Sequence, residues 1–270
     1  MSMIRVGTSG WVYPPWRDSF YPKGLAHRRE LEYMAQRLDS VEINGSFYAL
    51  QKPSSYLKWS EQTPDDFVFS VKSPRFITHM KRLVDVDEPL ATFFASGILA
   101  LGPKLGPLLW QLPPNLAFNA DTLAAFAAQL PKTTAAAAEF AGRHGDKVAD
   151  RAWTTTDADR PLRHAIEVRS PSFAVPDVPE ILRANNIALV IADSAGKYPY
   201  FEDLTADFVY ARMHGAEEMY VSGYTDEALG NWADKLRTWT AGGDGYVYFD
   251  NDVKVRSPYD AMGLRERLAE

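Results

Sequence analysis

Short apolar runs rich in Val, Ile, Phe and Tyr recur along the whole length of this 270-residue chain. Runs of this composition, four to eight residues long, are typical of buried β-strands. The pattern predicts strands at Ile4–Gly7, Ser40–Ile43, Phe67–Val71, Pro107–Gln111, His164–Val168, Ile187–Ala192, Phe208–Met213 and Gly245–Phe249.

Most of the segments between these strands have the periodicity of a helix. In Arg28–Leu38, for example, the apolar residues fall on one helical face. Further helices are predicted from Pro53 onward, at Glu88–Leu101, at Leu123–Leu130 with Asp121 as N-cap, at Thr133–Arg143 and at Tyr259–Leu268. Two segments lack a clear helical pattern. Ser194–Asp207 predicts an irregular crossover between strands six and seven, and Arg143–Arg163 a polar excursion.

The alternation of strands and helices predicts an α/β fold. Eight strands in a chain of 270 residues favour a single (β/α)8 TIM barrel that occupies residues 1–270 as one domain. An open, doubly wound sheet is the alternative. The segment Gly7-Thr8-Ser9-Gly10 argues against a dinucleotide-binding version of it, because it does not have the spacing G-x-G-x-x-G.

Composition limits the partners and the location. Lys and Arg number 29 against 35 Asp and Glu, so the formal charge is −6, which argues against general electrostatic binding of nucleic acid. The chain has no cysteine, which excludes disulfides and thiolate metal sites. Apolar runs are too short for a membrane span, and the start of the chain resembles no signal peptide. We therefore expect a cytoplasmic protein without a membrane partner; the oligomeric state stays open.

In a TIM barrel, active sites lie at the carboxyl ends of the strands. The sequence places reactive side chains at most of these ends. The candidates for catalysis are Glu42, Glu167, Asp193 and His214. The candidates for substrate binding are Trp11, Asn44, Lys72, Arg75, His79, Gln111, Arg169, Arg212, Asp250 and Asn251.

Alternation along the strands predicts where these side chains point. Residues two apart on a strand share a side, and the pairs Glu42/Asn44, Glu167/Arg169 and Arg212/His214 have this spacing. Charged pairs buried under helices would be costly, so we expect them in the barrel mouth. Structural ion pairs inside the barrel are the alternative for any single residue. His164 opens strand five at the opposite end and is expected to be structural.

These residue types support two classes of function. Carboxylates and a histidine suit the acid–base chemistry of a hydrolase, lyase or isomerase acting on a small polar or anionic substrate. They also suit a divalent metal as cofactor, although no compact ligand motif such as H-E-x-x-H is present. The alternative is non-catalytic binding. Lys72, Arg75, Arg169 and Arg212 would bind a phosphorylated ligand, and aromatic residues such as Trp11 would stack on carbohydrate or single-stranded nucleic acid.

An ordered set of motifs resembles the YecE-like family, a widespread family of TIM barrels with a domain of unknown function. The motifs are Val6–Trp11, Val41–Asn44 with Phe47-Tyr48, Phe69–Arg75, Trp110–Pro114, Glu167–Arg169, Arg212–Gly215 and Tyr248–Asp252. The resemblance implies the barrel fold but no established reaction. The chain departs from the family pattern at Ser170–Phe173 and from Asp250 to Tyr259, where Asp250 replaces an Asn. Whether its substrate or activity is that of typical family members therefore stays open.

Overall fold

A computed structural model describes residues 3–270, which contain nine parallel strands in one sheet. The strands are β1 Ile4–Ser9, β2 Ser40–Ile43, β3 Val68–Lys72, β4 Leu105–Gln111, β5 His164–Glu167, β6 Ile187–Leu189, β7 Ile191–Asp193, β8 Phe208–Met213 and β9 Asp244–Phe249. Their spatial order is β6-β5-β4-β3-β2-β1-β9-β8-β7. The two strands at the ends of this order are therefore consecutive in the chain.

The sheet closes into a barrel through the short gap between β6 and β7. Val190 alone separates these strands, and its N–H donates to the carbonyl of Ile166 on β5 at 2.9 Å. Because β6 pairs with β5 and β7 pairs with β8, the interrupted segment joins the two edges. The single strand predicted at Ile187–Ala192 is thus divided in two. When it is counted once, the architecture is the predicted (β/α)8 TIM barrel.

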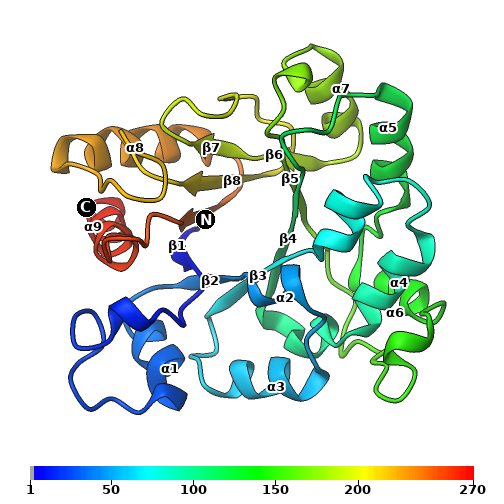
Figure 1. The fold of residues 1–270 in the computed structure, drawn as a ribbon, viewed down its shortest axis with the longest axis horizontal. Coiled ribbons are helices and arrows are strands. Elements are labelled where there is room, and N and C mark those ends of the chain that lie inside the picture. Colours follow the sequence, from blue (N-terminus) through cyan, green and yellow to red (C-terminus); the bar gives the residue numbers. More distant parts are fainter. Residues whose placement is uncertain (1–2) are drawn as a thin grey trace.

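Helices surround the strands, and the chain passes once around the barrel from β1 to α9 (Figure 1). They are α1 Glu30–Ala35, α2 Gly45–Tyr48, α3 Pro53–Glu61, α4 Asp87–Ala95, α5 Ala120–Gln129, α6 Thr134–Ala141, α7 Asp177–Ala184, α8 Asp226–Trp239 and α9 Ser257–Ala269. Between β7 and β8 the chain has no helix, as predicted. Thr205 holds this crossover, because its hydroxyl donates to the carbonyl of Ile187 and accepts from the N–H of Leu189.

Local chemistry sets several helix boundaries, and two predictions were wrong. Asn119, rather than Asp121, is the N-cap of α5, since its side chain accepts from the N–H of Thr122 at 2.8 Å. The helix predicted at Glu88–Leu101 ends at Ala95, because Gly97 adopts a φ of 114° and starts a separate 3-10 segment. Pro53 opens α3 as predicted.

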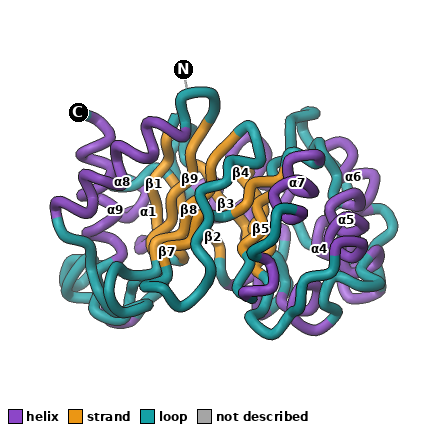
Figure 2. The backbone as a smooth tube through the Cα atoms, turned by 90° about the horizontal axis from the view of Figure 1, so that it is seen from above, coloured by secondary structure: helices purple, strands orange, loops and turns teal. Residues whose placement is uncertain are grey.

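Two apolar layers form the core. One lies between the strands and the surrounding helices, and the other lies inside the barrel. Figure 2 shows the strands in the middle of the molecule with helices on both sides of them. In the inner layer Tyr210 and Tyr248 are fully buried, and their hydroxyls pair with Ser70 at 2.7 Å and Ser40 at 2.8 Å. These side chains fill the barrel with satisfied polar groups. They form the floor beneath the candidate site.

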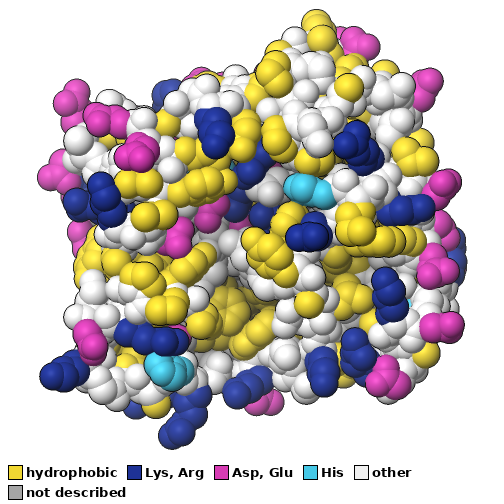
Figure 3. Space-filling model, in the orientation of Figure 1, with side chains coloured by type: hydrophobic (Ala, Val, Ile, Leu, Met, Phe, Trp, Pro, Cys, Tyr) yellow, Lys and Arg dark blue, Asp and Glu magenta, His cyan; other side chains and the backbone are white. Residues whose placement is uncertain are grey.

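The surface facing the viewer in Figure 1 is mixed in character. Figure 3 shows hydrophobic side chains across much of the middle of this face, with acidic groups gathered toward its left and right edges. Within residues 3–270, no helix combines the length and the apolar character that crossing a bilayer requires.

Candidate active site at the barrel mouth

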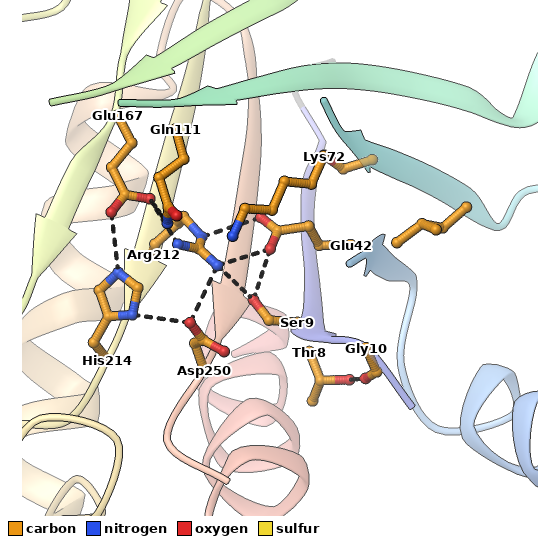
Figure 4. Close-up of polar contacts among 12 residues, drawn as sticks. Thr8, Ser9, Gly10, Glu42, Lys72, Gln111, Glu167, Arg212, His214 and Asp250 are labelled. Atoms are coloured by element: carbon orange, nitrogen blue, oxygen red, sulfur yellow. Dashed lines mark hydrogen bonds and ion pairs between the residues drawn. The ribbon is translucent and has the colours of Figure 1, made fainter. Parts of the chain in front are cut away.

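Inward-facing residues at the carboxyl ends of the strands meet in one cluster, which we call the mouth cluster (Figure 4). Its members are Ser9, Glu42, Lys72, Gln111, Glu167, Arg212, His214 and Asp250. Strand alternation brings them together. On β8, for instance, Tyr210 faces the floor, Arg212 lies one layer above it, and His214 follows directly after the strand. The pairs two residues apart therefore project into the mouth rather than under the helices.

Arg212 is the centre of the cluster and is fully buried. Its Nε and Nη2 donate to the two oxygens of Glu42 at 3.1 and 2.8 Å, and its Nη1 donates to Glu167 at 2.6 Å. Nη2 also contacts Asp250 at 3.2 Å. Burial by itself lowers the pKa of Arg212, but the surrounding carboxylates outweigh burial and raise it well above the usual value. The guanidinium therefore stays charged and holds three carboxylates in place.

Both carboxylate oxygens of Glu42 accept hydrogen bonds from protein donors. Besides Arg212, it accepts a hydrogen bond from the hydroxyl of Ser9 at 2.9 Å and another from Tyr210 at 2.7 Å. A carboxylate with this number of donors is satisfied without water. Neither Ser9 nor Tyr210 was among the residues predicted for the site. The sequence spacing could have indicated Tyr210, because it lies two residues before Arg212 and therefore points to the same side of the strand.

Glu167 is also fully buried and lies between two guanidinium groups. Arg169 donates to its Oε1 at 2.7 Å, while Arg212 and Gln111 donate to its Oε2 at 2.6 and 3.2 Å. Burial would raise the pKa of Glu167, but Arg169 and Arg212 prevail and hold it well below its usual range. The side chain is therefore a stable anion at neutral pH. Arg169 keeps 11% of its own side chain exposed and extends the cluster toward solvent.

His214 and Asp250 form a pair at the edge of the cluster. The imidazole Nδ1 lies 3.1 Å from Asp250 Oδ2, and 16% of the Asp250 side chain is exposed. The second ring nitrogen, Nε2, is buried without a hydrogen-bond partner in residues 3–270 and lies 3.7 Å from Glu167 Oε1. Burial raises the pKa of Asp250, but Arg212 and His214 lower it to a net value below the usual one. The pair thus presents an imidazole that is hydrogen-bonded at Nδ1, with Nε2 facing Glu167 beyond hydrogen-bond distance.

Lys72 differs from the other cations of the cluster. It is 8% exposed, and its Nζ makes no hydrogen bond or ion pair with any group of the described residues. Its ammonium lies 4.3 Å from the centre of the Phe47 ring. Burial and the nearby Arg212 lower the pKa of Lys72 to about 8, although three carboxylates oppose them. At pH 7.4 about a fifth of this amine is therefore neutral, far more than for an exposed lysine.

The rim of the mouth carries other predicted residues. Trp11 packs edge-on against Trp59, with ring centres 5.2 Å apart, and Asn44 lies half-buried with its Oδ1 unpaired. His79 packs edge-on against Phe47 at 5.0 Å. Burial and nearby cations lower the pKa of His79 to about 4, so its imidazole is neutral at neutral pH.

Three further predicted residues, Asp193, Asn251 and Arg75, lie outside both the mouth cluster and its rim. Asp193 accepts from the hydroxyl of Tyr224 at 3.0 Å, and that hydroxyl accepts from the N–H of Gly215, so Asp193 supports the loop after β8. Asn251 is buried and donates to Asp260 at 2.7 Å, which ties the loop after β9 to α9. Arg75 is exposed and lines a separate groove beside the mouth.

The carboxylates of the cluster are not arranged as metal ligands. Among residues 3–270, no group of three or more His, Asp and Glu side chains has the geometry to hold a metal ion. The oxygens of Glu42 and Glu167 accept hydrogen bonds from arginines instead. Binding a divalent cation there would require these guanidinium contacts to break.

Comparison with known proteins gives the family of the chain. YecE of Escherichia coli K12, a UPF0759 protein, is 28% identical over 98% of this chain and 93% of its own length. YunF of Bacillus subtilis is 33% identical over 42% of this chain and 40% of its own length. A solved DUF72 family protein from Thermotoga maritima superimposes with a TM-score of 0.79 at 24% identity, covering 99% of this chain and all of that one.

A second solved DUF72 protein, from Enterococcus faecalis, has a TM-score of 0.75 at 18% identity and covers 99% of this chain and 96% of its own. These two structures support the barrel fold. The family model described as "Protein of unknown function DUF72" matches residues 5–270. The resemblance to the YecE-like family is thereby confirmed, and the chain belongs to the DUF72 family.

Proposed function

We propose that this protein is an enzyme that transfers protons to and from a small anionic substrate bound in the barrel mouth. The observation that carries the proposal is the His214–Asp250 pair, whose Nε2 is buried without a partner. Leaving a buried polar atom unpaired costs about 1–3 kcal/mol, and such atoms in native structures call for an explanation. A substrate proton would satisfy this nitrogen.

The neighbouring residues give each group a role in this proposal. With the Nδ1 proton donated to Asp250, the Nε2 of His214 carries a lone pair and acts as general base. Lys72 and Arg169 are the basic residues of the mouth that keep some exposure, and Arg169 binds the anionic group of the substrate. Arg212 is fully buried and paired with Glu42, Glu167 and Asp250, so it acts as a positioning residue. A hydrolase, a lyase and an isomerase can all begin with this proton transfer, so the reaction class stays open.

Exchange of carbon-bound protons in D2O tests the proposal before the substrate is known. Pools of small anionic carbonyl and hydroxy acids and sugar phosphates are incubated with the protein and followed by proton NMR. We expect exchange in at least one compound, and His214→Asn should slow it by about 10²–10⁴-fold, the usual contribution of a general base. His144→Asn, in the loop after α6 and outside the mouth cluster, is the matched control.

Binding is measured alongside exchange by thermal denaturation. The same compound should raise the Tm of the wild type and of His214→Asn, because the cations that bind its anionic group are unchanged. No exchange in any pool, or equal exchange in His214→Asn, would remove the proton-transfer function.

A groove beside the mouth favours a second candidate, the binding of a phosphorylated aromatic ligand or single-stranded nucleic acid. The groove has a volume of about 1030 Å³. Its walls carry four basic residues and two acidic ones, namely Arg75, Lys81, Lys147, Arg151, Asp85 and Glu88. Tyr48 in the same wall is 74% exposed. Exposed aromatic rings beside cations are the elements that stack bases and contact phosphates.

A further inference from the structure

Lys72 stands apart from every other charged group in the mouth. Arg212 and Arg169 are engaged by carboxylates, whereas the Nζ of Lys72 has no carboxylate oxygen within 4 Å among residues 3–270. The aromatic ring of Phe47 lies beside it and offers no lone pair to accept a hydrogen bond. The side chain extends from β3 toward Arg212 and Glu42, over the centre of the cluster (Figure 4). An amine in this position can react with a bound molecule.

The surroundings keep this amine partly unprotonated. The charged and titratable groups that face it from the other elements are Arg212, Glu42, Glu167, Asp250 and His79. Burial is the largest influence, and the positive charge of Arg212 adds to it. A lysine that is desolvated and next to another cation is an activated nucleophile, because its neutral form carries the reactive lone pair.

We propose that Lys72 forms a Schiff base with a small anionic carbonyl compound, such as a 2-oxo acid. This inference rests on the proposed function and names its substrate class. The neutral Nζ adds to the carbonyl carbon, and the carbonyl oxygen takes a proton to give a carbinolamine. The nitrogen then loses a proton, the hydroxyl takes one from solvent and leaves as water, and a C=N bond forms. The net reaction is amine plus carbonyl plus one proton to iminium plus water.

The iminium would also explain why a base lies nearby. A positively charged C=N bond acidifies the protons on the adjacent carbon, and the free Nε2 of His214 is the base of the same mouth. Arg169 would bind the carboxylate of the 2-oxo acid, since a guanidinium matches that group in shape and charge. Substrate binding by Arg169 and bond formation by Lys72 are thus separate roles.

Reductive trapping tests the bond directly. The protein is incubated with glyoxylate or pyruvate and then with sodium borohydride, which reduces an iminium to a stable secondary amine. Peptide mass spectrometry should locate a carboxymethyl or carboxyethyl group on Lys72, while the surface lysines carry little of either modification. Trapping should increase with pH with a midpoint near the pKa of about 8, whereas exposed lysines titrate near about 10.4.

Two variants separate this chemistry from simple charge. Lys72→Arg retains a cation that binds anions but has no amine, so it should lose the adduct while the Tm still increases with glyoxylate. Lys58→Arg, exposed on α3 and outside both the mouth and the groove, should trap like the wild type. Adducts spread over surface lysines, unchanged in Lys72→Arg, would overturn the proposal. The absence of any adduct in a folded protein would overturn it as well. Proton exchange that persists in Lys72→Arg would show that the proposed function does not depend on a Schiff base.

Discussion

At the scale of single residues, the mouth is organised by Arg212. Its guanidinium contacts Glu42, Glu167 and Asp250; the first two are fully buried, and Asp250 keeps 16% of its side chain exposed. Burying ions is costly, and the cost is repaid only when geometry is good and the remaining donors and acceptors are satisfied. Here Ser9 and Tyr210 complete the shell around Glu42. We infer that Arg212 fixes the carboxylates rather than contacting a substrate.

Replacing Arg212 by Met tests this role through stability. The change leaves three carboxylates without their shared cation, so the free energy of unfolding should fall by about 3–5 kcal/mol. Urea denaturation at pH 7 measures the loss. Arg29→Met is the control, because the Arg29–Glu32 pair is exposed to solvent and its loss should leave the free energy of unfolding almost unchanged.

The same variant should also change how stability depends on pH. In the wild type the folded-state pKa values of Glu167 and Asp250 are depressed, so their stabilisation is present above the unfolded-state values and is lost as pH falls. Without Arg212, Asp250 loses the charge that most opposes its burial, whereas Glu167 keeps Arg169; burial should therefore raise the pKa of Asp250, and the stability of the variant should fall as pH rises. The difference between the two proteins therefore grows from pH 5 to pH 8. A small, pH-independent difference would contradict the positioning role.

At the scale of elements, the strands could be predicted and some of their details could not. Each predicted strand is present because apolar β-branched and aromatic runs suit a sheet covered on both faces. The break at Val190 has no signature in the sequence, since Val190 is as apolar as its neighbours. The break arises from pairing, because the two halves of the segment bind different neighbouring strands.

The site shows the same division between what alternation determines and what it does not. Glu42, Glu167 and Arg212 lie within strands, so the pleat alone directs them into the mouth. Asn251 lies two residues beyond β9, where loop backbone directs the side chain instead, and Asp193 ends its strand as Glu167 does but binds Tyr224 rather than the cluster. Both bind neighbouring loop and helix groups. Sequence spacing therefore predicted the centre of the cluster better than its periphery.

Strand β1 approaches β2 closely at Gly7, and this contact gives a prediction at the element scale. A Cβ at this position would lie 2.1 Å from the carbonyl oxygen of Ser40, which is backbone and cannot rotate away. Gly7→Ala should therefore separate the strands and lower the free energy of unfolding by roughly 1–3 kcal/mol or more. Thermal denaturation compares it with Gly242→Ala, where nothing lies within 4 Å of the new Cβ and the Tm should change little. Equal Tm values would refute the close approach.

At the scale of the whole molecule, charge distinguishes the two candidate functions. The formal charge is −6, so nucleic acid is repelled at long range. The mouth itself is locally balanced, with Glu42, Glu167 and Asp250 facing Arg212, Arg169 and Lys72. A small anion that enters the mouth meets cations at short range, where salt screens little. A nucleic acid lying across the groove would depend on exposed cations, which salt screens strongly.

Salt dependence of binding should therefore decide between a small anion in the mouth and a nucleic acid in the groove. We expect the affinity for glyoxylate, measured by calorimetry, to change less than about threefold between 20 and 200 mM salt, because partly buried pairs are screened weakly. A fluorescent oligothymidylate should show no saturable binding over the same range. The groove would be favoured instead by saturable binding of the oligonucleotide that weakens steeply with salt. Such binding should be lost in Lys147→Ala and retained in Lys72→Arg. The two outcomes differ because the mouth pairs its charges inside the barrel, whereas the groove presents them to solvent.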